Sequence, residues 1–162
     1  MSRVFIVGGV SGSGKTTISI LLAKKFKLPF HDADDFHPAS NVAKMHAGIA
    51  LDDEDREPWL EILANKIAQW QTEGGAVLAC SALKEKYRKQ LASKVKEEPI
   101  WVFLEGSPEL IAERIKSRPE HFFKASLLKS QFDTYEEPDY GLKLDVKFTP
   151  AEIVDQVAKA VQ

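Results

Sequence analysis

Residues 9–16, with the sequence GVSGSGKT, match the phosphate-binding pattern G-x-x-x-x-G-K-[ST] and lie between a predicted strand and a predicted helix. The glycines in this loop allow backbone N–H groups to close around a phosphate, and the dipole of the following helix favours an anion there. Lys15 supplies a positive charge for the β- and γ-phosphates, and the Thr16 hydroxyl can bind Mg²⁺. The pattern therefore predicts a nucleoside triphosphate site.

The other loop residues are expected to hold the phosphates rather than to react with them. Ser11 and Ser13 have no histidine nearby in the sequence that could activate a hydroxyl nucleophile, so we expect them to shape the loop. The predicted nucleotide-binding residues of this segment are Gly9, Val10, Ser11, Gly12, Ser13, Gly14, Lys15, Thr16 and Thr17.

A second segment with candidate catalytic side chains, HDADDFHP at residues 31–38, follows the first predicted helix. If the strand continues through Asp32, then Asp32 and Asp34 point to the same side at period two and Asp35 points away. We then expect Asp32 to support Mg²⁺, and Asp34 to orient or deprotonate a hydroxyl that attacks the γ-phosphate. The alternative is that Asp34 and Asp35 cap and solvate a helix that starts near FHPASN.

Two metal-site interpretations are weaker. His31, Asp32, Asp34 and His37 include good transition-metal ligand types, but they would have to converge from a strand and a turn, and no further pair at ligand spacing supports them. The acidic run DDEDRE at residues 52–57 lacks the glycine of a calcium loop and is followed by proline. We expect that run to be an acidic loop before a helix.

The phosphate loop alone does not distinguish a GTPase switch, a motor ATPase and a small-molecule kinase. The Asn65-Lys66 pair lies in a predicted helix and lacks the following aspartate that reads guanine. The apolar segment AVLACS at residues 76–81 lacks the terminal aspartate with which motor ATPases hold magnesium. These absences favour a kinase in which Asp32 takes that role.

These side chains must be positioned by alternating strands and helices. Short apolar runs predict strands over residues 3–9, 29–33, 76–81, 100–106 and 142–148. Helical periodicity or a first-turn proline predicts helices over residues 15–27, 58–70 and 107–118 and from Pro150 onward. Such alternation predicts a three-layer αβα fold with a parallel sheet of about five strands, in which ligands bind at the carboxyl ends of the strands.

Composition sets the remaining bounds. The 162 residues are expected to form a single domain, residues 1–162, and the net charge of −2 supplies no global field for nucleic acid or an anionic membrane. The lone Cys80 cannot form an intrachain disulfide, and we find no targeting segment or membrane-spanning run. We therefore expect a cytoplasmic protein that binds neither nucleic acid nor membranes.

Several blocks together resemble the gluconokinases, which are small P-loop kinases. DADDFHP is similar to the family pattern D-G-D-x-x-H-P, and NVAKMHAGIALDDEDREPWL to N-x-x-K-M-x-x-G-x-P-L-x-D-x-D-R-x-P-W-L. CSALKEKYR matches C-S-A-L-K-x-x-Y-R, and HFFKASLLKSQFDTYEEP follows the family pattern up to its closing E-P. Small departures occur at Ala33, Ala50 and Glu120.

The resemblance implies a nucleoside- or shikimate-kinase-like architecture that transfers the ATP γ-phosphate to the C6 hydroxyl of D-gluconate, with Mg²⁺ required. Such a site needs cations for the substrate carboxylate, and arginine suits a carboxylate best. The expected substrate-binding residues are Asp34, His37, Lys44, Arg56, Lys84, Arg88 and His121.

The resemblance also implies a lid within residues 114–138 that carries Arg114 and Arg118 toward the phosphates, with Lys15, Asp34 and Arg118 as the catalytic set. Pro150, in the segment KFTP, is the expected adenine contact. By the same analogy the chain is expected to form a homodimer. Two alternatives stay open: a related kinase with a shikimate- or nucleotide-type acceptor, and an ATP-binding regulator without transfer activity.

Overall fold

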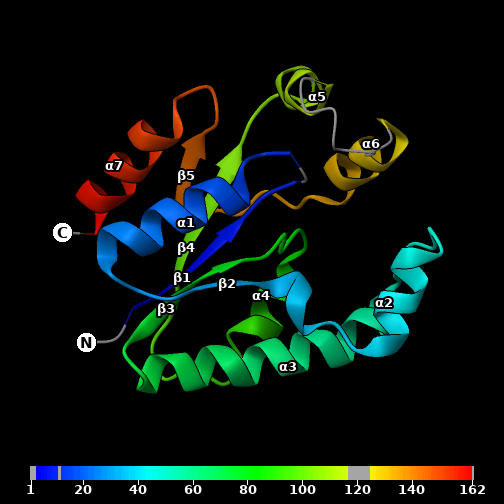
Figure 1. Cartoon of the computed structure of the whole chain (residues 1–162), viewed down its shortest axis with the longest axis horizontal. Coiled ribbons are helices and arrows are strands. Elements are labelled where there is room, and N and C mark those ends of the chain that lie inside the picture. The colour runs from blue at the N-terminus through cyan, green and yellow to red at the C-terminus, as the bar shows by residue number, and fades with distance from the viewer. Residues whose placement is uncertain (1–2, 11, 117–124, 162) are drawn as a thin grey trace.

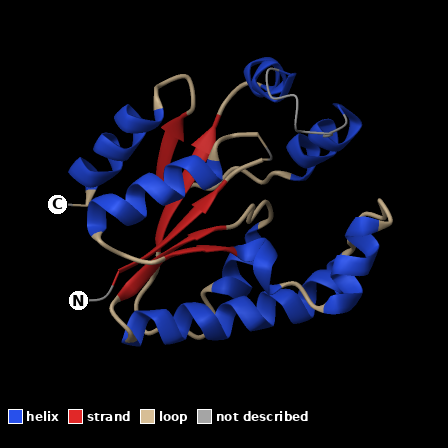
Figure 2. Cartoon of the chain, in the orientation of Figure 1, coloured by secondary structure: helices blue, strands red, loops and turns tan. Residues whose placement is uncertain are grey.

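The computed structural model describes residues 3–10, 12–116 and 125–161. A five-stranded sheet in the order β2-β3-β1-β4-β5 forms its centre, and every neighbouring pair is parallel (Figures 1 and 2). The strands are β1 (Arg3–Gly8), β2 (Phe30–Asp32), β3 (Gly75–Ala79), β4 (Ile100–Glu105) and β5 (Leu142–Asp145). All five carboxyl ends therefore meet at one edge of the sheet, which confirms the predicted parallel arrangement.

Helices cover both faces of the sheet and make the three layers. The helical elements are α1 (Lys15–Phe26), η1 (Ala33–Phe36), α2 (Ala39–His46), α3 (Asp53–Thr72), α4 (Glu85–Leu91), α5 (Pro108–Lys116), α6 (Ala125–Thr134) and α7 (Pro150–Ala160). Figure 1 shows α1 and α7 on one face and α3 and α4 on the other. Helices α2, α5 and α6 lie toward the carboxyl edge of the sheet, where they can border a ligand.

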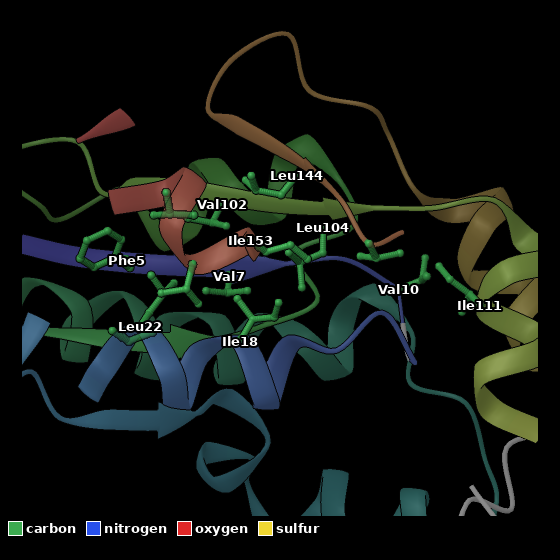
Figure 3. Close-up of a cluster of buried hydrophobic side chains, with 14 of the residues drawn as sticks. Phe5, Val7, Val10, Ile18, Leu22, Val102, Leu104, Ile111, Leu144 and Ile153 are labelled. Atoms are coloured by element: carbon green, nitrogen blue, oxygen red, sulfur yellow. The ribbon is translucent and has the colours of Figure 1, made fainter. Parts of the chain in front are cut away.

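Alternation along β1 divides the core into two clusters. Phe5 and Val7 face the layer of α1 and α7, whereas Val4 and Ile6 face α3. Figure 3 shows the first cluster, which includes Phe5, Val7, Ile18, Leu22, Val102, Leu104, Leu144 and Ile153. Because both faces of the strand are buried, the sequence is a continuous apolar run, as a sandwiched parallel strand requires.

One expected boundary is wrong. The acidic run at residues 52–57 is the beginning of α3 and not a loop before a helix at Pro58. Asp52 caps the helix by accepting the N–H of Asp55, and Asp55 returns a carboxylate to the N–H of Asp52 at 3.0 Å. This capping box and the acidic first turn stabilise the helix N-terminus strongly enough that Pro58 lies inside the helix.

The expected strands are longer than the observed ones at their carboxyl ends. β5 ends at Asp145, three residues before the expected end, because the Asp145 side chain accepts the N–H of Lys147 at 2.9 Å and turns the chain. None of the helices in the described part of the chain is long and apolar enough to cross a membrane.

Candidate active site

The phosphate loop joins β1 to α1, and its backbone requires glycine. Gly9, Gly12 and Gly14 have φ of 147°, 80° and 97°, in the region that L side chains rarely adopt. A Cβ on Gly12 would lie 2.6 Å from Cγ1 of Ile115 in α5, so the loop also passes too close to that helix for any side chain. No side chain caps the N-terminus of α1, which leaves its first N–H groups to an anion.

Lys15 lies folded back onto its own loop. Its Nζ donates to the carbonyl oxygens of Gly9 at 2.9 Å and Val10 at 3.1 Å. Burial lowers the pKa of Lys15, while the nearby carboxylates of Asp34 and Asp32 act in the opposite direction. The loop lysine and the two predicted aspartates are therefore close enough to interact electrostatically.

Asp32 and Asp34 do reach the same edge of the sheet, but not by the strand alternation that predicted it. β2 ends at Asp32, and Asp34 lies in the short helix η1. Asp32 caps that helix by accepting the N–H of Asp34 at 2.9 Å. The expectation that Asp34 lies on a continued strand is therefore wrong, because a capping aspartate favours a turn over further extension.

The two carboxylates differ in their environment. Burial is the main cause that raises the pKa of Asp32. The contact with His37 is the main cause that lowers the pKa of Asp34, and Lys15 acts in the same direction. His37 Nε2 lies 3.6 Å from Asp34 Oδ1, and the Asp34 side chain is 79% exposed. An ionised, accessible carboxylate therefore stands beside the phosphate loop.

The two histidines of the HDADDFHP segment are held apart by aromatic partners. His31 stacks on Trp70 and His37 stacks on Trp59, each with ring centroids 4.2 Å apart. Among the described residues, no three His, Cys, Asp or Glu side chains are grouped to hold a metal ion. The transition-metal alternative thus finds no cluster, and His31 has a packing role.

A cavity of about 380 Å³ opens beside Asp34 and is a candidate acceptor site. Three predicted substrate residues line it: Asp34, His37 and Arg56. Its walls also include Trp59, Tyr87 and segments at residues 48–51, 81–83 and 130–134. The carbonyl oxygen of Ser81 in this wall accepts the N–H of Gly9 at 3.1 Å, so the cavity adjoins the phosphate loop.

Arg56 is positioned by its neighbours at the rim of this cavity. Its Nη1 donates to the Tyr87 hydroxyl at 3.2 Å and lies 4.0 Å from Asp53 Oδ1. The Tyr87 hydroxyl in turn donates to Asp53 at 2.5 Å. Arg56 remains partly exposed. Its guanidinium group can therefore meet a carboxylate of a ligand bound in the cavity.

Three other predicted substrate residues do not line this cavity. Both carboxylate oxygens of Asp55 accept from Lys44 Nζ at 2.8 Å. Lys84 Nζ lies 3.7 Å from Asp53 Oδ1 and over the Tyr87 ring.

Arg88 is 2% exposed and donates to the carbonyl oxygens of Ala82, Leu83 and Glu136. Lys44, Lys84 and Arg88 therefore contact protein groups and do not line this cavity, and their contact with the substrate stays a prediction.

A second cavity, of about 370 Å³, lies on the other side of the phosphate loop. It is lined by Gly12, Ser13, Gly14, Thr17, Ile18, Arg114, Lys147, Phe148, Thr149, Pro150 and Ile153. The structure thus brings the predicted Arg114 and the KFTP segment to the phosphate loop. Arg114 also donates to the carbonyl oxygen of Val146. Ser11, Arg118 and His121, which were also predicted as site residues, lie outside the described residues.

Tyr87 and Trp59 were not predicted as parts of the site, whereas α6 falls within the segment 114–138 that was predicted as a lid. Tyr87 falls within the block CSALKEKYR, so its position in that block was the available signal. Trp59 has a donor, its indole Nε1–H, which binds the carbonyl oxygen of Ala33 at 2.8 Å and fixes η1. Nothing in the local sequence distinguishes such a tryptophan from an ordinary core residue.

Comparisons with known proteins identify the family of the chain. A family model described as shikimate kinase matches residues 11–161. A gluconokinase from Arabidopsis thaliana is 40% identical, over 98% of this chain and 92% of that protein. A gluconokinase from Gluconobacter oxydans is 44% identical, over 84% of this chain and 76% of that protein. The chain belongs to the gluconokinase family.

Solved structures place this family member among P-loop kinases. A gluconokinase from Sinorhizobium meliloti superposes with a TM-score of 0.86 at 36% identity, covering 98% of this chain and 95% of that one. A sugar kinase from Janibacter gives 0.90 at 39% identity, covering 99% and 95%. A shikimate kinase from Aquifex aeolicus, at 20% identity and a TM-score of 0.62, shares the fold, over 98% of this chain and 96% of that chain.

Proposed function

We propose that this protein transfers the γ-phosphate of ATP to the C6 hydroxyl of D-gluconate. The observation that carries the proposal is the placement of an ionised Asp34 and a partly exposed Arg56 in one cavity that adjoins the phosphate loop. The gluconokinase relatives support gluconate as the acceptor. A sugar acid offers a carboxylate for Arg56 at one end and a hydroxyl for Asp34 at the other.

ATP binds with its adenine and ribose in the cavity of about 370 Å³ and its phosphates on the loop. Lys15 leaves its two carbonyl acceptors and meets the β- and γ-phosphates, which are stronger partners for a cation. Pro150 and Lys147 border the nucleoside, and Arg114 lines the same cavity. By the family resemblance, Arg118 is the second arginine proposed to act on the phosphates. These cations neutralise the charge of the transferred group.

Thr16 and Asp32 fit a magnesium site. A hydroxyl and a carboxylate oxygen are the hard ligands that Mg²⁺ takes, and a cation would offset the burial that raises the pKa of Asp32. When bound, the ion withdraws charge from the phosphate oxygens during transfer.

Asp34 orients the attacking hydroxyl rather than removing its proton in advance. The lowered pKa of Asp34 keeps it ionised at neutral pH but makes it a weak base. A loose phosphoryl-transfer transition state needs little prior deprotonation, so orientation by a hydrogen bond is sufficient. The proton passes to Asp34 as the new O–P bond forms. His37 and Tyr87 line the same cavity, with His37 Nε2 beside Asp34 and the Tyr87 hydroxyl bonded to Asp53.

An acceptor panel tests the proposal directly. The protein with Mg²⁺ and ATP would be assayed by coupled ADP release with gluconate, shikimate and nucleoside monophosphates in turn. Gluconate alone should give fast turnover, and phosphorus NMR of the product should place the phosphate on C6. Turnover only with another acceptor would overturn the substrate assignment, and ATP hydrolysis without acceptor dependence would favour the regulator alternative.

The proposed setting of this reaction is the cytoplasm. The lone Cys80 is buried and free, and a free thiol suits a reducing compartment such as the cytoplasm. The family resemblance favours a homodimer, which sedimentation velocity at micromolar concentration would detect. The formal charge of −2 gives no general attraction to nucleic acid or membranes.

A further inference from the structure

Asn41 is a buried polar side chain near the acceptor cavity, although it does not line the cavity. It lies in α2 and is 2% exposed. Its side-chain nitrogen lies 2.8 Å from the carbonyl oxygen of Asp55 in α3 and 3.2 Å from Nδ1 of His37. One amide group therefore joins two segments of the cavity wall.

The contact with Asp55 fixes which way the Asn41 amide points. A backbone carbonyl oxygen only accepts hydrogen bonds, so the atom that faces it must be the amide nitrogen and not the amide oxygen. The same nitrogen carries the second hydrogen toward His37 Nδ1. Nδ1 must then be an acceptor, because a protonated Nδ1 would place two N–H groups against each other.

This arrangement selects one tautomer of neutral His37. With Nδ1 as acceptor, the ring proton resides on Nε2, which lies 3.6 Å from Asp34 Oδ1. The His37 ring stacks on the Trp59 ring, and the two ring planes make an angle of 15°. This stack holds the plane of the His37 ring. Trp59 is itself tied to η1 through the carbonyl oxygen of Ala33. The Nε2–H group is consequently aimed at the Asp34 carboxylate and the cavity.

We infer that Asn41 is a positioning residue that holds His37 as its Nε2–H tautomer and thereby orients Asp34 toward the acceptor hydroxyl. The inference rests on the proposed function for its kinetic consequence, but the tautomer itself is a property of the protein without substrates. In the opposite tautomer, Nε2 would present a lone pair to the carboxylate, and Asp34 would turn away from it.

The first test is spectroscopic. Long-range ¹H–¹⁵N correlation spectra of the protein labelled with ¹⁵N-histidine report which ring nitrogen carries the proton, and the His37 signal is the one that disappears in His37→Gln. We expect the Nε2–H tautomer in the wild-type protein at neutral pH. Proton occupancy on Nδ1 would overturn the inference, whether or not gluconate proves to be the acceptor.

The second test is kinetic. Asn41→Ala should leave His37 as a mixture of tautomers and lower kcat between about 10-fold and 100-fold, with little change in the KM for ATP. Asn41→Asp should move a proton onto Nδ1 and lower kcat similarly. Asn65→Ala is the matched control, because the Asn65 side chain lies on the exposed face of α3, where it donates to the carbonyl oxygen of Glu61 and accepts from Lys94.

The outcomes separate cleanly. An Asn41→Ala protein that keeps wild-type kcat, or one that keeps a single Nε2–H tautomer, would overturn the inference. If neither variant folds, the wild-type spectrum still decides it. If the tautomer is as expected but gluconate is not phosphorylated, the proposed function fails and the assignment of Asn41 stands.

Discussion

Replacing Arg56 by lysine tests how the acceptor carboxylate is held. Lysine keeps the positive charge but loses the planar fork that allows two parallel hydrogen bonds to one carboxylate. Each hydrogen bond to a charged group contributes about 1.5–3 kcal/mol, so the loss of one lowers kcat/KM for gluconate by about 10- to 150-fold. Arg56 is partly exposed and its Nη1 already bonds Tyr87, so the remaining donors are available to the ligand.

The assay is steady-state kinetics with gluconate and ATP varied separately. The KM for gluconate should rise while the KM for ATP stays within about twofold. Arg3→Lys is the matched control, because Arg3 is exposed at the start of β1 and contacts only the Phe26 ring among the interactions described for it. An unchanged KM for gluconate in a folded Arg56→Lys protein would refute the assignment of the carboxylate to Arg56.

Three further predictions concern the loop and the start of α3. Gly12→Ala should weaken ATP binding by about tenfold or more in calorimetric titration, because its Cβ would meet Ile115. Gly74→Ala is the matched control: Gly74 also has positive φ, but a Cβ there would meet no atom, so ATP binding should not weaken. Asp52→Ala should lower the free energy of unfolding in urea by about 1 kcal/mol, and an unchanged midpoint would contradict the capping role. The contacts of Asp53 with Lys86 and Tyr87 lower its pKa to about 2, so its stabilisation is present above about pH 4 and is lost as the pH falls through 2. The free energy of unfolding of the wild-type protein should therefore fall more steeply than that of Asp53→Asn as the pH falls over this range, measured by urea denaturation. Parallel pH dependences for the two proteins would contradict the stabilising role of Asp53.

The sequence predicts the fold well where the chemistry is local. Apolar runs predict all five strands, and GVSGSGKT predicts the loop together with its flanking elements. The sequence also contains the signal for the start of α3, since Asp52 and Asp55 have the spacing of a capping box. A proline is frequent in the first turn of a helix, so Pro58 predicted a later start than the capping box gives.

The candidate site was predictable only in part, because periodicity cannot tell where a strand gives way to a turn. Asp34 reaches the cavity through η1, which depends on the Asp32 cap and on the distant Trp59 indole. The contacts of a cationic side chain also depend on residues that are distant in the sequence. Arg56 meets the cavity, whereas Arg88 is committed to carbonyl groups from segments about fifty residues apart.

The role of Asp34 in phosphoryl transfer to gluconate is tested most directly by Asp34→Asn beside Asp35→Asn. Both residues lie in η1, but only Asp34 lines the acceptor cavity. We expect Asp34→Asn to bind ATP normally in calorimetric titration and to lose about 100-fold or more in gluconate-dependent kcat. Asp35→Asn should keep near wild-type turnover. A folded Asp34→Asn protein that binds ATP and phosphorylates gluconate at the wild-type rate would contradict the proposed mechanism.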